Sequence, residues 1–186
     1  WGNDTLSGGA DADRFRASEG SGTDSVIGGE TGNDIDTLDL IDSGATGGVT
    51  VSYTGAEAGT YDFNGTTAAG SFSGIEAVDL TDSADTLNAA AATSSITAFG
   101  LAGNDALTGG SAADVLDGGA GNDSLTGGLG NDTFTGGAGS DRFVLTTGGG
   151  ADLVTDFDLG DADLDGRTND WLDLSGLSDT QGGAVT

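Results

Sequence analysis

The stretch GGAGNDSLTGGLGNDTFTGGAGSDRFV, residues 118–144, repeats one nine-residue pattern three times. Each copy has glycine in its first, second and fourth places, Asp in the sixth and Leu or Phe in the eighth. The register extends back through GGSAADVLD (109–117) to GLAGNDALT (100–108). The sixth place therefore holds Asp105, Asp114, Asp123, Asp132 and Asp141. A fixed period of this kind indicates a repeat architecture.

A second array opens the chain, and a longer repeat relates the two arrays. WGNDTLSGGADADRFR has Asp4 and Asp13 in the sixth place, and GNDTLSGGADADRF (2–15) matches GNDTFTGGAGSDRF (130–143) at a constant shift. We therefore expect a slice of a tandem array. Its expected segments are the end of a first array (1–42), an irregular β-solenoid segment (43–99), the main array (100–145) and a closing segment (146–186).

Composition narrows the classes of partner and chemistry. The 186 residues include 37 Gly, 31 acids and four Arg, giving a net charge of −27, with no His, Cys, Met or Pro. Such a chain repels nucleic acid and anionic membranes. The sequence contains no run of about 20 apolar residues, so we expect no membrane-spanning segment. Without His, Cys or Lys we expect no enzyme, although a glycosidase-type pair of carboxylates stays open. Hard cations such as Ca²⁺ are the expected ligands.

The spacing of the residues explains why Asp and glycine recur. Side chains in a strand alternate, so of the three residues after each Asp only the eighth of the block points inward. Two blocks make one coil, and each turn stacks on the turn two blocks earlier. Asp105, Asp123 and Asp141 then share one edge, and Asp114 and Asp132 share the other. Calcium between stacked Asp residues, with turn carbonyls completing about six oxygen ligands, would neutralise each column.

The energetics favour folding that depends on metal. One buried Leu or Phe per block stabilises by roughly 1.5–3 kcal/mol, whereas ordering nine residues costs on the order of 10 kcal/mol. Ion binding must supply much of the difference, which predicts an unfolded apo form. Between the arrays, β-prone runs at 49–53, 60–63, 75–80, 85–88 and 94–99 predict further strands of an all-β fold.

The blocks resemble the G-G-x-G-x-D-x-U-x pattern of RTX (repeats-in-toxin, hemolysin-type calcium-binding) proteins, and DRFVLTTGGGADLVTDFDLGD resembles the segments that follow such arrays. The resemblance implies a right-handed parallel β-roll (a β-solenoid), type I secretion and folding on contact with extracellular calcium. It also implies ligands: carbonyls of the second and fourth residues and the Asp of one turn, with carbonyls of the first and third residues and the Asp of the turn two blocks later.

Carried onto this chain, the resemblance implies four calcium sites in the main array and one at the N-terminus. The first three are Leu101, Gly103 and Asp105 with Gly118, Ala120 and Asp123; Gly110, Ala112 and Asp114 with Gly127, Leu129 and Asp132; and Gly119, Gly121 and Asp123 with Gly136, Ala138 and Asp141. The fourth joins Gly128, Gly130 and Asp132 to Thr147, Gly149 and Asp152, and the N-terminal one joins Gly2 and Asp4 to Glu19, Ser21 and Asp24.

Several positions depart from the pattern or add to it. Leu101 and Ala112 replace glycines, so we expect strain in their turns, and Asp85 is expected to pair with Asp105 below the array. Asp161, Asp163 and Asp165 begin like an EF-hand loop, but position twelve is Leu172. Asp170 or Asp173 could complete that site; the alternative is a solvated acidic loop. Arg14 and Arg142 are expected to pair with neighbouring carboxylates.

The leading hypothesis is a calcium-binding structural module of a large secreted or cell-surface bacterial protein, such as an adhesin, surface-layer or filament-like spacer. Its expected partners are calcium and neighbouring units of the same chain, including self-association into an array. The alternative is the RTX tail of a type I-secreted enzyme, such as a metallopeptidase, lipase or alginate epimerase. A carbohydrate- or ice-binding face is a third reading, with Thr126 and Thr135 as its candidates.

Overall fold

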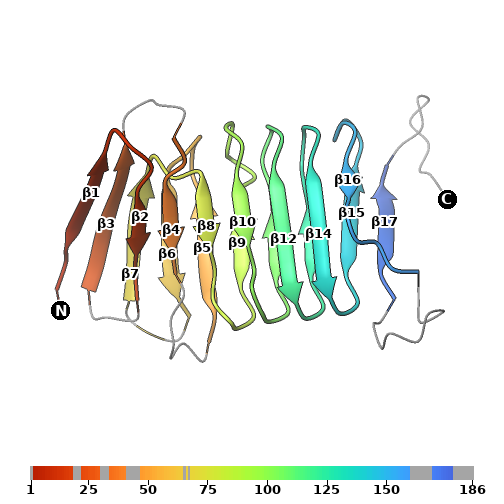
Figure 1. Ribbon diagram of the computed structural model, residues 1–186, viewed down its shortest axis with the longest axis horizontal. Coiled ribbons are helices and arrows are strands. Elements are labelled where there is room, and N and C mark those ends of the chain that lie inside the picture. The colour runs from red at the N-terminus through yellow and green to blue at the C-terminus, as the bar shows by residue number, and fades with distance from the viewer. Residues whose placement is uncertain are drawn as a thin grey trace.

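The protein is built from β-strands and turns, stacked along one long axis (Figure 1). A computed structural model describes residues 2–18, 22–29, 34–40, 47–64, 66, 68–159 and 169–177. Within them, no helix is long and apolar enough to cross a membrane. The strands are β1 Thr5–Gly9, β2 Arg14–Arg16, β3 Gly22–Gly29, β4 Thr37–Asp39, β5 Val49–Tyr53, β6 Gly59–Phe63, β7 Ala68–Ser73, β8 Ala77–Asp79, β9 Thr86–Asn88, β10 Thr97–Phe99, β11 Ala106–Thr108, β12 Val115–Ala120, β13 Ser124–Thr126, β14 Thr133–Ala138, β15 Arg142–Thr146, β16 Leu153–Val154 and β17 Trp171–Gly176.

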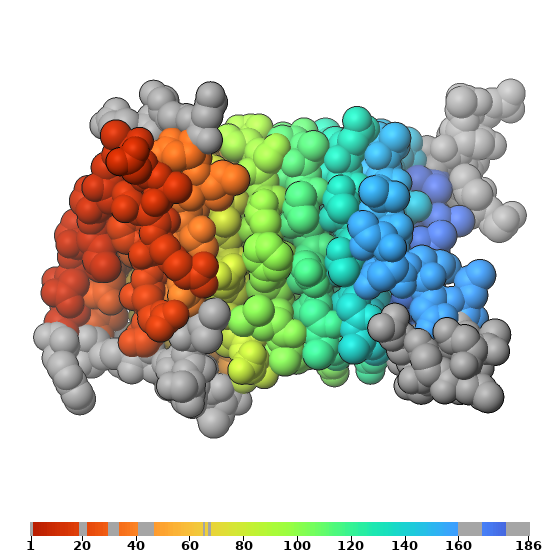
Figure 2. Space-filling view, viewed as in Figure 1, coloured from red at the N-terminus to blue at the C-terminus, as the bar shows by residue number. Residues whose placement is uncertain are grey.

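Two sheets form the walls of the roll. The ten-stranded sheet has the order β1-β3-β7-β6-β5-β9-β11-β13-β15-β17, and the seven-stranded sheet has the order β16-β14-β12-β10-β8-β4-β2. From β8 onward the chain alternates between the two sheets at every strand. Successive coils therefore follow one another along the long axis of the roll, as the colour gradient of Figure 2 shows. The expected all-β parallel β-roll is confirmed.

The register of the main array follows the nine-residue period. Leu107 of β11 pairs in parallel with Leu125 of β13, which pairs with Phe143 of β15. On the opposite wall, Leu116 of β12 pairs with Phe134 of β14. All five side chains are fully buried. One coil is thus two blocks long, and the eighth residue of each block fills the core as expected.

The segment between the arrays is where the fold departs from a regular roll. Strands β5, β6 and β7 form an antiparallel meander inside the ten-stranded sheet, with β7 joined in parallel to β3 and β5 to β9. In the other wall β4 pairs directly with β8. The inserted strands lengthen one wall relative to the other. The β-prone runs predicted β5, β6, β8, β9 and β10, but not β7.

The long repeat is visible in the structure, with its two copies on opposite walls. β1 lies in the ten-stranded sheet, whereas β14, its counterpart in the second copy, lies in the seven-stranded sheet. Likewise β2 pairs with β4 in the seven-stranded sheet, and β15 pairs with β17 in the ten-stranded sheet. The unit that separates the copies therefore contains an odd number of half-coils.

The two arginines of the long repeat form equivalent ion pairs. Arg14 Nε lies 3.0 Å from Asp39 Oδ2, and Arg14 also pairs with Asp79. In the second copy Arg142 pairs with Asp173, and its guanidinium lies 5.2 Å from the centre of the Trp171 ring. The expected pairing of both arginines with neighbouring carboxylates is confirmed.

Candidate metal centres

Stacked Asp residues run along both turn edges of the main array. In each stacked pair the backbone N–H of one Asp donates to the carboxylate of the Asp one coil later. The pairs and distances are Asp105 to Asp123, 2.7 Å; Asp123 to Asp141, 2.9 Å; Asp114 to Asp132, 2.9 Å; Asp132 to Asp152, 3.0 Å; and, at the N-terminus, Asp4 to Asp24, 2.9 Å. The structure thus brings together every pair of Asp residues that the resemblance implied.

In four of the five array Asp residues only one carboxylate oxygen accepts a hydrogen bond; the exception is Asp114, whose Oδ1 accepts the N–H of Ile96 at 2.8 Å and whose Oδ2 accepts the N–H of Gly110 at 2.6 Å. Oδ2 of Asp105, Asp123, Asp132 and Asp141 is buried and has no hydrogen-bond partner among the residues that the structure describes. The four side chains are at most 2% exposed. A buried carboxylate oxygen without a partner is costly, because the interior cannot replace the water it has lost. Each of the four oxygens is therefore in a position that a cation would stabilise.

Glycine leaves room beside these oxygens. The first residue of each block is a glycine whose missing Cβ would lie against the carboxylate of that block: the distance to Oδ2 would be 2.5 Å for Gly100 and Asp105, and 2.5 Å for Gly136 and Asp141. The fourth residue has a second constraint, since Gly121 has φ of +143° and an added Cβ would overlap the carbonyl oxygen of Gly103. Only glycine allows both the turn and the open space.

Burial also raises the pKa of these carboxyl groups. Desolvation, reinforced by the neighbouring carboxylates Asp85 and Asp123, raises the pKa of Asp105 to about 7. The same cause, with smaller effects of neighbouring Asp residues, raises the pKa values of Asp132 and Asp141 to about 6 each. A bound divalent cation would favour the ionised form and reverse this shift.

The turns that carry the implied carbonyl ligands are stacked in the required register. In the first site Ala120 N–H donates to Leu101 O and Gly103 N–H donates to Ala120 O, both at 2.8 Å. In the second, Leu129 N–H donates to Gly110 O at 2.9 Å, and in the third Gly121 N–H donates to Ala138 O at 2.7 Å. A carbonyl oxygen has two lone pairs, so a carbonyl that accepts one of these hydrogen bonds keeps a second lone pair that can coordinate a metal ion.

The fourth and N-terminal sites keep the same alignment despite two extra residues. Gly150 stacks on the carbonyl of Gly130, just as Gly121 stacks on Gly103, and this places Thr147 and Gly149 at the first and third places of their block. Gly22 stacks on the carbonyl of Gly2 in the same way. The other implied N-terminal ligands, Glu19 and Ser21, lie outside the described residues, as do Asp161, Asp163 and Asp165 of the acidic loop.

The two departures from the glycine pattern differ. Leu101 has φ of +71°, a left-handed conformation that costs a residue with a Cβ about 1–2 kcal/mol, so strain in this turn is confirmed. Among the described residues Leu101 is the one non-glycine with positive φ. The expected strain at Ala112 is therefore wrong. Ala112 occupies a fourth place without the positive φ that Gly103 and Gly121 adopt there, and it avoids strain because its turn takes a different backbone conformation.

Sequence reasoning gave no role to the Asn in the fifth place, which ties one turn to the next. Asn104 Oδ1 accepts the N–H of Asn122, and Asn122 Oδ1 accepts the N–H of Ser140, both at 2.8 Å. Asn131 accepts the N–H of Ala151 and Asn3 accepts that of Thr23. The signal was present in the recurrent GND triplet. These amides hold the turns in stack and so position the carbonyls.

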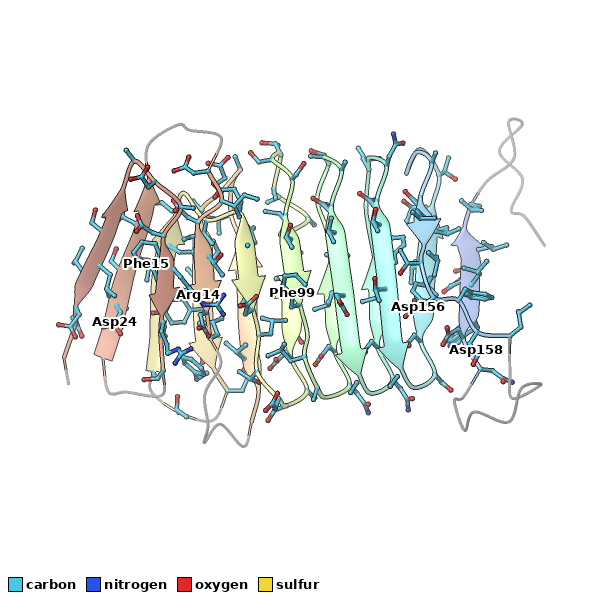
Figure 3. The ribbon with its side chains drawn as sticks, viewed as in Figure 1. Arg14, Phe15, Asp24, Phe99, Asp156 and Asp158 are labelled. Atoms are coloured by element: carbon cyan, nitrogen blue, oxygen red, sulfur yellow. The ribbon has the colours of Figure 1, made fainter. Side chains whose placement is uncertain are left out.

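Both columns also have members that the repeat pattern did not reveal. Asp141 N–H donates to Asp170 Oδ1 at 2.9 Å, so Asp170 continues the column across the excursion after β16. Its Oδ2 accepts the N–H of Asp158, and Figure 3 shows Asp156 and Asp158 at this closing end of the roll. Asp13 N–H donates to Asp36 Oδ1 at 2.8 Å in the N-terminal array.

The donor set fits calcium better than a transition metal. Among the described residues no group of three or more His, Cys, Asp or Glu side chains is close enough to hold a metal. Each expected site instead combines two carboxylates with backbone carbonyls, all of them hard oxygen donors. Calcium accepts six to eight such oxygens in flexible geometry, whereas zinc favours nitrogen and sulfur. The unpartnered Oδ2 atoms and the space beside them are what such a site requires.

Comparison with known families agrees with this geometry. The RTX calcium-binding nonapeptide repeat matches four stretches of the chain, residues 2–24, 97–125, 108–143 and 126–155. The matched stretches of this chain are RTX calcium-binding nonapeptide repeats. Curated protein sequences give no match. RTX repeats bind calcium and are typical of secreted bacterial proteins. The matches cover the main array and residues 2–24 of the first array, and they leave the meander between the arrays unmatched.

Proposed function

We propose that this RTX chain is a structural module of a large secreted or cell-surface bacterial protein, and that it folds when it meets extracellular calcium. One observation carries the proposal: four buried carboxylate oxygens, on Asp105, Asp123, Asp132 and Asp141, have no hydrogen-bond partner in the described part of the chain. The stacked carboxylates within each column repel one another when they are ionised. A divalent cation at each step supports both the charge balance and the coordination of the orphan oxygens.

The proposed extracellular location follows from the calcium concentration at which such sites fill. Calcium modules that work outside cells bind with dissociation constants of about 10⁻⁴–10⁻³ M. Sites of this strength stay empty inside a cell, so the chain would remain unfolded during export and order afterwards. RTX repeats and the absence of Cys, which rules out disulfide staples, support metal as the stabilising element.

The role in the parent protein is proposed as structural rather than catalytic. A stiff stack of coils suits a spacer in an adhesin, a surface layer or a filament-like protein. Strands β1, β2, β16 and β17 stand at the ends of the two sheets, so neighbouring units of the same longer chain could continue both walls. The alternative, a folding tail of a type I-secreted enzyme, rests on the same repeats, and no feature of the described residues favours it.

Calcium titration followed by far-UV circular dichroism tests the proposal. The chain in EGTA should lack most of its β signal, gain it cooperatively with calcium at millimolar or lower concentration, and lose it again when EGTA is added. Magnesium at the same concentration is the control, since its demand for octahedral geometry suits these sites poorly. A spectrum that is fully β-rich in EGTA would refute metal-dependent folding.

A further inference from the structure

The central segment, residues 47–99, has a different kind of core from the RTX array at 100–145. Of the 26 buried hydrophobic residues among those described, 16 lie in the central segment and five in the array. The central ones include large side chains that contact one another: the ring centres of Tyr53 and Phe72 are 4.9 Å apart, and those of Tyr61 and Phe63 are 6.1 Å apart. Burial of this density is what holds metal-free domains together.

The buried carboxylate of the central segment, Asp85, has both oxygens satisfied by the protein itself. Asp85 lies level with the array column, but its Oδ1 accepts the N–H of Val49 at 2.6 Å and its Oδ2 accepts the N–H of Thr81 at 2.7 Å. The Thr81 hydroxyl is within hydrogen-bonding distance of both oxygens. Asp85 therefore resembles Asp114, both of whose oxygens also accept N–H groups, and differs from the other four array Asp residues, each of which leaves one buried oxygen without a hydrogen-bond partner among the described residues.

The opposite edge shows the same change. Strand register places Ile96 level with Glu76 on one side and Asp114 on the other, so an apolar side chain, 1% exposed, interrupts the carboxylate column. Glu76 in turn accepts the N–H of Asp36 at 2.8 Å. On the first edge Asp85 does stack on Asp105, as expected, with its N–H donating to Asp105 Oδ1 at 2.8 Å, but Asp85 has no unsatisfied oxygen to offer a cation.

The topology of the central segment is also more local than that of the arrays. β5, β6 and β7 follow one another as antiparallel neighbours, so their pairing closes only short loops. Each coil of the array instead pairs strands two blocks apart in parallel. Short-range antiparallel pairing forms faster and needs less loop-closure entropy than the stacking of coils.

From these differences we propose that residues 47–99 fold without calcium and act as a seed on which both calcium-dependent arrays assemble. β9 offers its outer edge to β11, and β10 offers its edge to β12, while β7 and β8 receive β3 and β4 on the other side. The seed thus presents a strand edge in both sheets and toward both ends. It refines the proposed function, because calcium then controls the growth of the roll and not its nucleus.

Hydrogen exchange of the full chain, followed by mass spectrometry in EGTA and in calcium, tests this directly. In EGTA, peptides covering β5, β6, β7 and β9 should exchange at least about 100-fold more slowly than an unfolded chain, and peptides covering 100–145 should exchange without protection. Calcium should then protect the array. Equal, unprotected exchange of both segments in EGTA would overturn the seed.

A pair of matched variants locates the effect. Phe63 in the seed and Phe134 in the array are both 0% exposed, so Phe63→Ala and Phe134→Ala remove the same buried ring. Phe63→Ala should abolish the protection of the seed in EGTA, whereas Phe134→Ala should leave it within about twofold. If Phe63→Ala does not fold even in calcium, the smaller change Val51→Ala should still weaken seed protection. Loss of seed protection in Phe134→Ala would refute an independent seed.

The outcomes separate this inference from the proposed function. A chain that is unprotected throughout in EGTA and ordered by calcium contradicts the seed but supports calcium-triggered folding. Protection of the seed with an array that calcium never orders supports the seed and contradicts the proposed function. Protection of every strand in EGTA contradicts both.

Discussion

Replacing Asp123 by Asn tests whether one carboxylate serves two ions. Asp123 stands between Asp105 and Asp141 in its column, accepting the N–H of the first and donating its own N–H to the second. Its Oδ2 is buried and no described residue donates a hydrogen bond to it. Asn keeps the shape and the accepting oxygen but removes the charge from both sites. Asp105→Asn is the matched variant, because Asp105 belongs to one expected site and also accepts a backbone N–H, from Asp85.

The size of the effect follows from the charge removed. A unit charge about 2.4 Å from a divalent cation is worth about 3.5 kcal/mol even with the dielectric constant of water. Keeping the amide oxygen as a ligand returns part of this, so each site should weaken by about 100-fold. If the four array sites fill as one unit, two weakened sites raise the calcium midpoint by the fourth root of about 10⁴, or about tenfold, and one weakened site raises it by about threefold.

The assay is the calcium midpoint of the circular dichroism signal for each variant. Asp62→Asn is the charge control, because this side chain is exposed on β6, away from both columns. The expected order is Asp123→Asn at about tenfold, Asp105→Asn at about threefold and Asp62→Asn near the parent value. Equal shifts for Asp123→Asn and Asp105→Asn would show that Asp123 does not bridge two sites, and a comparable shift for Asp62→Asn would reduce the effect to net charge.

Three further predictions concern the turns and the pH. The raised pKa values of Asp105 and Asp141 mean that the folded apo array would bind protons more tightly than the unfolded chain, so in EGTA the free-energy cost of folding the array should decrease as the pH falls from 8 to 5, and this gain should be lost as the pH rises through 6–7. The calcium midpoint should rise over the same range on acidification, and an unchanged midpoint would contradict the assignment of these carboxylates as ligands. Gly121→Ala should prevent ordering of the array at any calcium concentration, because its Cβ would overlap Gly103 O, whereas Gly55→Ala, which meets open space, should leave thermal unfolding in calcium unchanged. Leu101→Gly should relieve the left-handed strain and stabilise the calcium form by up to about 1 kcal/mol, visible as a higher Tm; a lower Tm would show that the Leu side chain contributes more than the strain costs.

The main array could be predicted from the sequence because the nine-residue period determines which side chains are buried and which turns stack on one another. The eighth-place residues, from Leu107 to Phe143, are buried since strand side chains alternate and every coil has the same length. The same arithmetic placed Asp123 next to Asp105 and Asp141. No contact between distant segments had to be guessed, because each block meets only the blocks one coil before and after it.

The rest of the fold could not be predicted in this way because the period is lost. β7, Ala68–Ser73, contains Ala, Gly and Ser and carries little strand propensity of its own. It becomes a strand because Phe72 packs into the core and β3 and β6 pair with its two edges. The place of Asp170 in the column could not be predicted for a related reason: the sequence suggested a role for it in the acidic loop, and only the structure shows that the column resumes there, far beyond Asp141 in the chain.

The opposite placement of the two long-repeat copies has a geometric consequence. Arg14, which pairs with Asp39, is partly exposed on one broad wall and Arg142, which pairs with Asp173, is partly exposed on the other, although the same stretch of the long repeat contains both arginines. Each half-coil carries the chain from one sheet to the other. A unit with an odd number of half-coils therefore places the next copy of the unit on the opposite wall, rotated by half a turn about the long axis. Repetition of this unit would therefore place each surface feature on the two walls alternately, so that the two broad faces of a long roll would carry the same features.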